Sequence, residues 1–407
     1  MWHTAGTGKR REAGLMRFVK TVMLGIVCFV LGGAVTRYYD THRVAPPQTA
    51  KLAEEEVLKI DLENEPLWAY GFEMPAKPGD KAQPQNPPSR NLRANQDPEE
   101  QTRPRRIKGS QAAYSLVDVR DGQNVIDWFP EDHPPMPDVI VHGPAALGAK
   151  KRGCASCHLP TGKGRPENAA PAGLPVGYIM RQLQDFRSGR RYTSDPRKPN
   201  TPTMIELAKS LSDEEMKAAA EYFSAIKWTP WVRVVETDLV PRTRIAGNLF
   251  LPLEHEKTQP IGNRIIEMPE DEEQAETYRN PHSGFIAYVP KGSLAKGKDL
   301  VTTGGARVVG NEFIRGKTTP CITCHGEDLM GAADIPPIAG RSPSYMVRQM
   351  WDIKQGTRTS DQAQLMKLVL ASLTPDDMLA IAAYVASRPP HYPPKTDNVS
   401  VTTQNIH

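Results

Sequence analysis

The sequence predicts a mostly α-helical protein with two similar helical domains in tandem. One observation is an internal repeat: positions 154 and 321 begin the same short motif, an offset of 167 residues. Another is helical spacing, because Tyr178, Arg181 and Gln182 lie at i, i+3 and i+4 and recur 167 residues later. The only long apolar run lies near the N-terminus, before both repeats.

That apolar run, FVKTVMLGIVCFVLGGAV at 18–35, predicts a membrane anchor. Cationic residues before it indicate a cytoplasmic N-terminus; they are Lys9, Arg10, Arg11 and Arg17. A cleaved signal peptide is the alternative, because a run of this length only just spans a bilayer. We expect residues 1–40 to form a cytoplasmic stub and a single-pass anchor in a bacterial inner membrane, with the rest of the chain in the periplasm. Cys28 is expected to face lipid within the anchor.

Residues 41–110 are rich in proline and charge and show no sustained helix or strand period. The chain's 38 prolines and mean hydropathy of −0.51 agree with long stretches that bury little. We expect a semi-extended tether here, with a possible short helix over 51–60. Residues 111–139 follow as an accessory segment, whose aromatic and proline residues suit packing over a neighbouring domain.

Two helical domains are predicted at 140–228 and 291–390. The last helix of each begins with a capping signature, a hydroxyl residue followed three positions later by an acidic one. The predicted capping pairs are Ser212 with Glu215 and Thr374 with Asp377. Apolar residues in these final helices, including Met216 and Met378, are expected to fill the cores.

The segment between the domains, residues 229–290, has short β-branched runs and prolines. This composition predicts extended strands or an interdomain wrap. The acidic stretch at 268–276 is expected to be a solvated loop. Residues 391–407 are predicted to be a C-terminal tail.

The charge of the chain is nearly balanced, with 51 Lys and Arg against 47 Asp and Glu and a formal net charge of +4. The basic residues do not gather into a motif that would follow a phosphate backbone. We therefore expect no nucleic-acid partner.

Two pentapeptides carry the candidate chemistry, CASCH at 154–158 and CITCH at 321–325. Structural zinc is one alternative, but each repeat would supply only an incomplete ligand set. A thioredoxin-like dithiol is another, but it belongs beside a βαβ pattern that neither repeat shows. Covalent haem attachment explains every position, because two thiols three apart can each form a thioether while the next histidine reaches the iron.

With these motifs the chain resembles the class I c-type cytochromes, in particular their tandem two-haem members. The resemblance covers 140–228 and 291–390 and extends to the PAGLP and PIAGR loops, the YxxRQ helices and the LSDEEM and LTPDDM helices. It implies two class I cytochrome c-like helical domains and two covalently bound haem c groups. The residues implied in haem attachment and proximal ligation are Cys154, Cys157, His158, Cys321, Cys324 and His325.

Domains of this family usually complete the iron coordination with a methionine, and we expect Met204 and Met366, in a loop or turn before each final helix. The matched pair inside the final helices is better explained as core. Lone histidines outside the repeats are expected to be structural; they are His133, His142, His255 and His282. The family pattern also implies a backbone carbonyl near Pro171 or Pro337 that holds each axial histidine.

Two further matched pairs, Arg181 with Arg348 and Tyr178 with Tyr345, have two interpretations. They could hold haem propionates. They could equally form a polar stripe that packs one domain on the other or faces water.

The function predicted is that of a membrane-tethered dihaem cytochrome, an electron carrier rather than an enzyme. Its partners would be redox proteins: a membrane complex, an exported dehydrogenase or a terminal oxidase. Two alternatives stay open, a dihaem enzyme such as a peroxidase and a haem subunit of a larger dehydrogenase or oxidase complex. A cysteine-ligated sulfur-compound dehydrogenase is excluded, because Cys28 is the only cysteine outside the two motifs.

Overall fold

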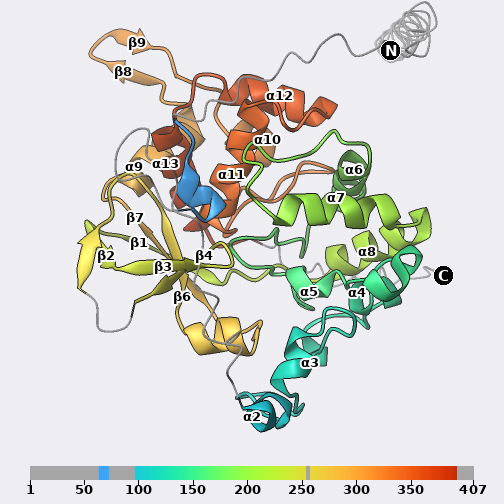
Figure 1. Cartoon of the computed structure of the whole chain (residues 1–407). Coiled ribbons are helices and arrows are strands. Elements are labelled where there is room, and N and C mark those ends of the chain that lie inside the picture. Colours follow the sequence, from blue (N-terminus) through green and yellow to red (C-terminus); the bar gives the residue numbers. More distant parts are fainter. Residues whose placement is uncertain (1–63, 73–96, 254–256, 392–407) are drawn as a thin grey trace, which may run out of the picture. The chain divides into compact units, whose positions relative to one another are not determined.

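The computed structural model describes residues 64–72, 97–253 and 257–391, whose elements are shown in Figure 1. The predicted anchor at 18–35, with Cys28, the possible helix at 51–60 and His255 lie outside the described residues. Among the described helices none alone is long and apolar enough to cross a membrane. A pair bent by 110°, α12 (Asp361–Leu370) with α13 (Pro375–Ala386), meets the same criteria together.

The first repeat is helical, as predicted. Its helices are α4 (Asp138–Val141), α5 (Ala155–His158), α6 (Val176–Arg187), α7 (Asn200–Ser210) and α8 (Asp213–Ala225), with a short 3₁₀ segment at Ala145–Lys150. Helix α6 contacts both α7 and α8. Their apolar faces enclose a core that includes Ile140, Leu183 and Phe223.

The second repeat has the corresponding helices and one addition. Its helices are α9 (Ser293–Thr303), α10 (Ile322–His325), α11 (Pro343–Lys354), α12 and α13. Helix α13 packs along α9 and α11. The addition is a hairpin of β8 (Arg307–Val309) and β9 (Glu312–Ile314), which lies between α9 and the CITCH motif and has no counterpart in the first repeat.

Both predicted caps are confirmed. The Ser212 side chain accepts a hydrogen bond from the Glu215 backbone N–H, and Thr374 does the same for Asp377, so each final helix begins with a capping box. Met216 and Met378, one turn into these helices, are fully buried. Their expected role in the core is therefore confirmed.

The segment between the repeats forms short strands, which confirms its predicted extended character. They are β1 (Val232–Glu236), β2 (Leu239–Pro241), β3 (Thr243–Ala246), β4 (Leu249–Pro252), β5 (Thr258–Pro260), β6 (Ile266–Pro269) and β7 (Phe285–Val289). In the three-stranded sheet, β7 lies between β1, to which it is parallel, and antiparallel β6. Buried side chains from these strands share one core with α11 and α13, so the segment is part of the second domain's packing.

The prediction of an unpacked tether over 41–110 is wrong for residues 64–72. A 3₁₀ turn, Leu67–Tyr70, is buried in the core shared by the β segment and the second repeat. The Tyr70 hydroxyl donates a hydrogen bond to Asp352 on α11 at 2.7 Å. The physical reason is that four large apolar side chains within six residues, at Leu67, Trp68, Tyr70 and Phe72, bury enough area to offset the cost of ordering this stretch.

The accessory segment packs over its neighbours, as predicted. It contains α3 (Leu116–Arg120) and a 3₁₀ turn at Pro130–Asp132. The preceding residues 97–110, predicted as part of the tether, form α2 (Pro98–Thr102) and bury Ile107, so the tether prediction is wrong there too. Ile107, Val119, Trp128 and Phe129 form a small buried cluster. The Trp128 indole N–H donates to the carbonyl of Tyr278 at 2.7 Å, which fastens this cluster to the segment between the repeats.

The acidic stretch at 268–276 differs from the predicted solvated loop. Met268 lies in strand β6. Glu276 lies in the helical turn Glu273–Thr277, and its side chain is buried. Glu276 forms an ion pair with Arg165 of the first repeat. A buried carboxylate needs such a partner, so part of this acidic stretch is structural.

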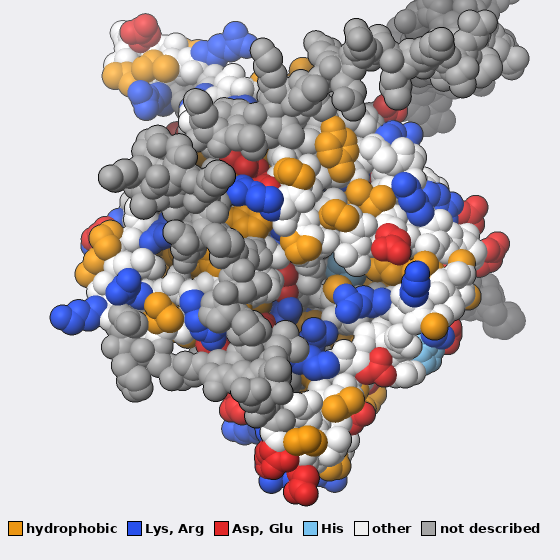
Figure 2. All heavy atoms as spheres, viewed as in Figure 1, with side chains coloured by type: hydrophobic (Ala, Val, Ile, Leu, Met, Phe, Trp, Pro, Cys, Tyr) orange, Lys and Arg blue, Asp and Glu red, His pale blue; other side chains and the backbone are white. Residues whose placement is uncertain are grey.

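Charged side chains of both signs are spread over the face drawn in Figure 2. This distribution agrees with the small net charge of +4. Hydrophobic side chains gather on the upper part of the same face, in the region that carries α10, α11 and α12 in Figure 1.

Candidate haem sites

Each CxxCH motif forms a single helical turn that brings its three functional side chains together. Cys154 is the N-cap residue of α5, and the backbone N–H of His158 donates to the Cys154 carbonyl at 3.1 Å. In α10 the corresponding bond joins His325 to Cys321 at 3.0 Å. The four cysteines of the two motifs form no disulfide with one another. Because residues i and i+3 lie on one side of a helix, the two thiols of each motif can reach one planar ligand.

The histidine of each motif is held by a backbone carbonyl at matched positions. His158 Nδ1 lies 2.9 Å from the Ala169 oxygen, and His325 Nδ1 lies 3.0 Å from the Pro336 oxygen. A carbonyl oxygen can only accept, so Nδ1 carries the proton and Nε2 is left to bind iron. Burial lowers the pKa of both imidazoles, which favours this neutral form. These carbonyls lie within two residues of the predicted Pro171 and Pro337.

The loop after each histidine follows one backbone path in both repeats although its residues differ. Positive φ occurs at three matched pairs: Leu159 (61°) with Gly326 (80°), Gly162 (63°) with Leu329 (60°), and Gly164 (63°) with Gly331 (70°). A Cβ on Gly164 would lie 2.2 Å from the Ala169 oxygen, the atom that holds His158. Glycine is therefore required there for both its φ and its close backbone contact.

The surroundings of the first cysteine of each motif suit a thioether bond better than a reactive thiol. Burial raises the pKa of Cys154 to about 12 and that of Cys321 to about 11. Redox-active thiols have lowered pKa values and electropositive surroundings. A neutral sulfur in an apolar pocket is what a thioether to a porphyrin provides, so these residues fit a covalently bound haem.

The two expected methionine ligands pack against the same cores as the attachment cysteines. Met204 joins the cluster that contains Cys154, and Met366 joins the one that contains Cys321. Both lie inside helices, α7 and α12, so the prediction of a loop or turn is wrong in this detail. Their role as iron ligands stays a prediction.

Three of the described histidines outside the motifs, His133, His142 and His282, contact local partners. His133 contacts Asp127 at 3.3 Å and the Pro134 carbonyl at 2.9 Å, and its ring lies edge-on to Tyr222. His142 bonds to the Gln123 carbonyl at 2.7 Å. His282 stacks on Phe129 and bonds to Asp132.

A nearly symmetric network of arginine and glutamine joins the two repeats. Arg191 donates to both Gln182 and Gln349 at 2.7 Å. Arg358, at the matching position, donates to the same two side-chain oxygens at 2.6 and 3.3 Å. Arg191 and Arg358 also form an antiparallel backbone bridge. Both arginines lie in the repeat, so the identity at an offset of 167 was the sequence signal that could have identified them.

The matched Arg and Tyr pairs serve this domain interface. Arg181 forms an ion pair with Asp334 of the other repeat at 2.6 Å. Arg348 is buried and donates to the carbonyls of Pro166 at 3.2 Å and Glu167 at 3.3 Å. The Tyr345 hydroxyl accepts from Arg191 at 3.1 Å. Of the two interpretations, packing of one domain on the other accounts for these contacts.

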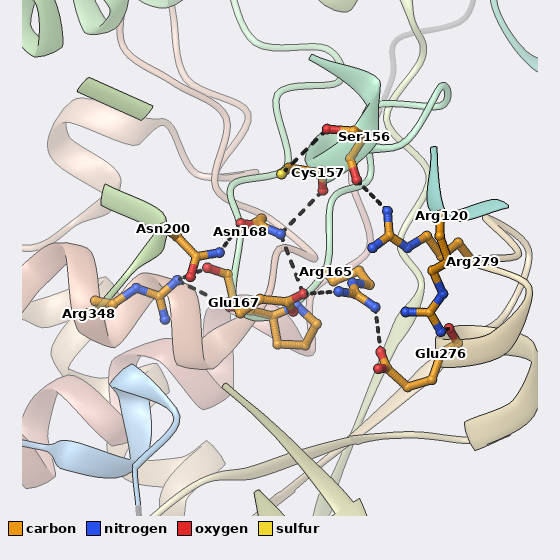
Figure 3. A network of polar contacts seen from close by, with 11 residues as sticks. Arg120, Ser156, Cys157, Arg165, Glu167, Asn168, Asn200, Glu276, Arg279 and Arg348 are labelled. Carbon is orange, nitrogen blue, oxygen red and sulfur yellow. Dashed lines mark hydrogen bonds and ion pairs between the residues drawn. The ribbon is translucent and has the colours of Figure 1, made fainter. Parts of the chain in front are cut away.

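A second polar network, drawn in Figure 3, contacts the backbone of the first CxxCH helix. Arg279 donates to the Ser156 carbonyl at 2.9 Å, and Asn168 donates to the Cys157 carbonyl at 3.4 Å. Arg165 lies between the carboxylates of Glu167 and Glu276. Periodicity and motif spacing contain no signal for this network, because its members come from three separate segments.

Comparison with known proteins agrees with this geometry. The cytochrome c family model matches residues 145–227 and 305–389. A thiosulfate dehydrogenase electron acceptor of Stutzerimonas stutzeri is 27% identical over 60% of this chain and 80% of its own length. Cytochrome c4 of Pseudomonas aeruginosa is 23% identical over 60% of this chain and 88% of its own. Cytochrome c-554(548) of Halomonas halodenitrificans is 34% identical over 18% of this chain and 88% of its own.

The family match falls on both repeats, and each repeat has the attachment helix and the carbonyl-held histidine that a covalently bound haem c requires. The relatives that span most of both repeats are named thiosulfate dehydrogenase electron acceptor and cytochrome c4. The chain therefore belongs to the cytochrome c family, as a two-domain c-type cytochrome that carries two covalently bound haem c groups and transfers electrons.

Proposed function

We propose that this dihaem cytochrome accepts electrons from an exported dehydrogenase and passes them to a membrane-bound acceptor. The observation that carries the proposal is the matched construction of the two sites, each with two cysteines, a histidine held by a carbonyl, and a methionine in the same core. If His158 and Met204 bind one iron, and His325 and Met366 bind the other, neither iron would keep a free coordination position. Such a site exchanges electrons and has no position for a substrate.

The chemical class of the donor is proposed from the relatives. The proteins of Stutzerimonas stutzeri and Thiomonas intermedia, 27% and 25% identical, are each named thiosulfate dehydrogenase electron acceptor. By analogy, the donor to this chain would be a dehydrogenase that oxidises an inorganic sulfur compound. This chain would not oxidise that compound itself, since the two motifs use every cysteine except Cys28.

The location is proposed from the sequence. The apolar run at 18–35 would anchor the chain in a bacterial inner membrane, and the preceding cations would keep the N-terminus in the cytoplasm. Both haem domains would then lie in the periplasm, where exported dehydrogenases operate.

Rapid-mixing spectroscopy tests the donor. The full-length protein, purified in mild detergent with both haems, is mixed with a purified thiosulfate dehydrogenase and thiosulfate, and haem reduction is followed by its absorbance. We expect rapid reduction of both haems that depends on the dehydrogenase. Thiosulfate alone is the control and should reduce neither haem. Reduction by thiosulfate without the enzyme, or no reduction with it, would rule out the proposal.

A further inference from the structure

The loops that follow the two haem-binding histidines have opposite charge. The first, at 159–169, contains Lys163, Arg165 and Glu167. The second, at 326–336, contains only acidic charged residues, namely Glu327, Asp328 and Asp334. Each loop supplies the carbonyl that holds its own histidine, so each charge set lies next to one haem site.

The cationic charge beside the first site is shielded from water. The Arg165 side chain is 16% exposed, and its two partners are more deeply buried, Glu167 at 2% and Glu276 at 7%. Arg120 donates to the backbone carbonyl of Glu276 at 2.8 Å. These contacts collect charged groups from the accessory segment, the first repeat and the segment between the repeats (Figure 3).

Arg279 brings this cluster to the attachment helix itself. Its guanidinium donates to the carbonyl of Ser156, the residue before Cys157, at 2.9 Å. Burial, with Arg165 and Arg120 nearby, lowers the pKa of Arg279 to about 10, so it stays protonated at pH 7. Its backbone has a positive φ of 49°, a conformation that costs a non-glycine residue free energy and is kept only where the surroundings impose it.

The cluster therefore holds three guanidinium groups, Arg120, Arg165 and Arg279, against the two carboxylates of Glu167 and Glu276. One positive charge is in excess. In the second loop the charges are of opposite sign, but Glu327 and Asp328 are exposed to water. Solvent screens exposed charges far more than buried ones, so the cationic cluster should have the larger effect.

Uptake of one electron lowers the charge of a haem site by one unit. A nearby buried positive charge stabilises the reduced form and so raises the reduction potential. We propose that Arg120, Arg165 and Arg279 raise the potential of the first haem site above that of the second. An electron shared between the sites then resides at Cys154–His158 in preference to Cys321–His325, whichever protein delivers it.

A redox titration of the full-length dihaem protein tests this order. The haems are assigned by the variants Met204→His and Met366→His, each of which alters the spectrum of one site. In the wild type we expect the first haem to be reduced first. The equilibrium constant for transfer of one electron from the second haem to the first, called the exchange constant below, should be at least about 10, which corresponds to a difference of about 59 mV between the two potentials. If the second haem is reduced first, the proposal is overturned.

Two substitutions, one that removes a positive charge and one that removes a negative charge, test whether the charge of the cluster sets the potential of the first haem. Arg279→Gln removes a charge but keeps an amide donor for the Ser156 carbonyl, and should lower the exchange constant roughly three- to tenfold. Glu167→Gln removes a negative charge and should raise it. The potential of the second haem should stay unchanged in both variants and serves as the internal reference.

Matched controls separate charge from packing. Arg279→Lys keeps the charge and should change the exchange constant less than about twofold, as should Glu327→Gln at the exposed position in the second loop. If Arg279→Gln does not fold with both haems, Glu167→Gln alone decides the result. Shifts of less than about twofold in Glu167→Gln, or shifts of the same sign in both substitutions, would show that the cluster does not set the potential.

Discussion

Replacement of Gly164 by alanine should damage the first haem site more than the glycine's φ alone would explain. Gly164 has φ 63°, and an added Cβ would lie 2.2 Å from the oxygen of Ala169. That oxygen accepts the hydrogen bond from His158 at 2.9 Å. Because backbone atoms cannot approach so closely, the Ala169 carbonyl must move and the bond to the axial histidine must lengthen or break.

The structure also supplies the control for the magnitude. Gly189 has φ 75° and no atom within 4 Å of an added Cβ, so Gly189→Ala should cost only the conformational term, about 1 kcal/mol. Gly164→Ala adds the backbone shift and the loss of a buried hydrogen bond, which costs about 1–3 kcal/mol. We therefore expect the free energy of unfolding to fall by about 2–4 kcal/mol in Gly164→Ala.

The assay is denaturant unfolding of the dihaem protein, followed by haem absorbance and by circular dichroism, with a redox titration of each variant. Gly164→Ala should also raise the potential of the first haem alone, since a weaker bond from Nδ1 makes the imidazole a poorer electron donor, which stabilises the oxidised iron less at that site only. If Gly164→Ala is no more destabilising than Gly189→Ala, or if both haems change equally, the argument from loop geometry is refuted.

Further predictions concern a buried acid, the domain interface and the methionines. Burial raises the pKa of Glu267 from 4.5 to about 7. The protein is therefore most stable with respect to this group below pH 4.5, and the free energy of unfolding should fall by about 3 kcal/mol as the pH rises through 7. In Glu267→Gln, which cannot ionise, this fall should be absent from the pH dependence of unfolding. Gln349→Leu removes an oxygen that accepts hydrogen bonds from the buried side chains of Arg191 and Arg358. It should lower the free energy of unfolding, measured with denaturant, by about 2–4 kcal/mol. The control Gln184→Leu, at an exposed position on α6, should lower it by less than about 0.5 kcal/mol. Met204→Leu should abolish the methionine-to-iron charge-transfer band of the first haem only, and Met366→Leu that of the second; an intact band in either variant would assign the sixth ligand elsewhere.

Patterns of residues close together in the sequence were sufficient to predict the parts of the fold that occur in both repeats. Ser212 and Thr374 begin their helices as predicted, because a cap depends on residues only three positions apart. Each attachment site lies within one helical turn, so its cysteines and histidine are recognisable without tertiary contacts. The 64–72 segment was missed for the opposite reason: its burial depends on a core more than 150 residues away in the chain, while its own neighbours are prolines and charges.

The sequence by itself determined that there are two CxxCH domains and where each begins its last helix, and it predicted which residues attach the haems, because all of these are encoded over short spacings and repeated once. Only the tertiary structure decided how Arg191 and Arg358 join the repeats, and how Arg120, Arg165 and Arg279 meet behind Ser156. Charges from three distant segments act together only when folding removes them from water and brings them within a few ångströms. The difference between two otherwise similar haem sites therefore arises in the folded chain and not in either motif.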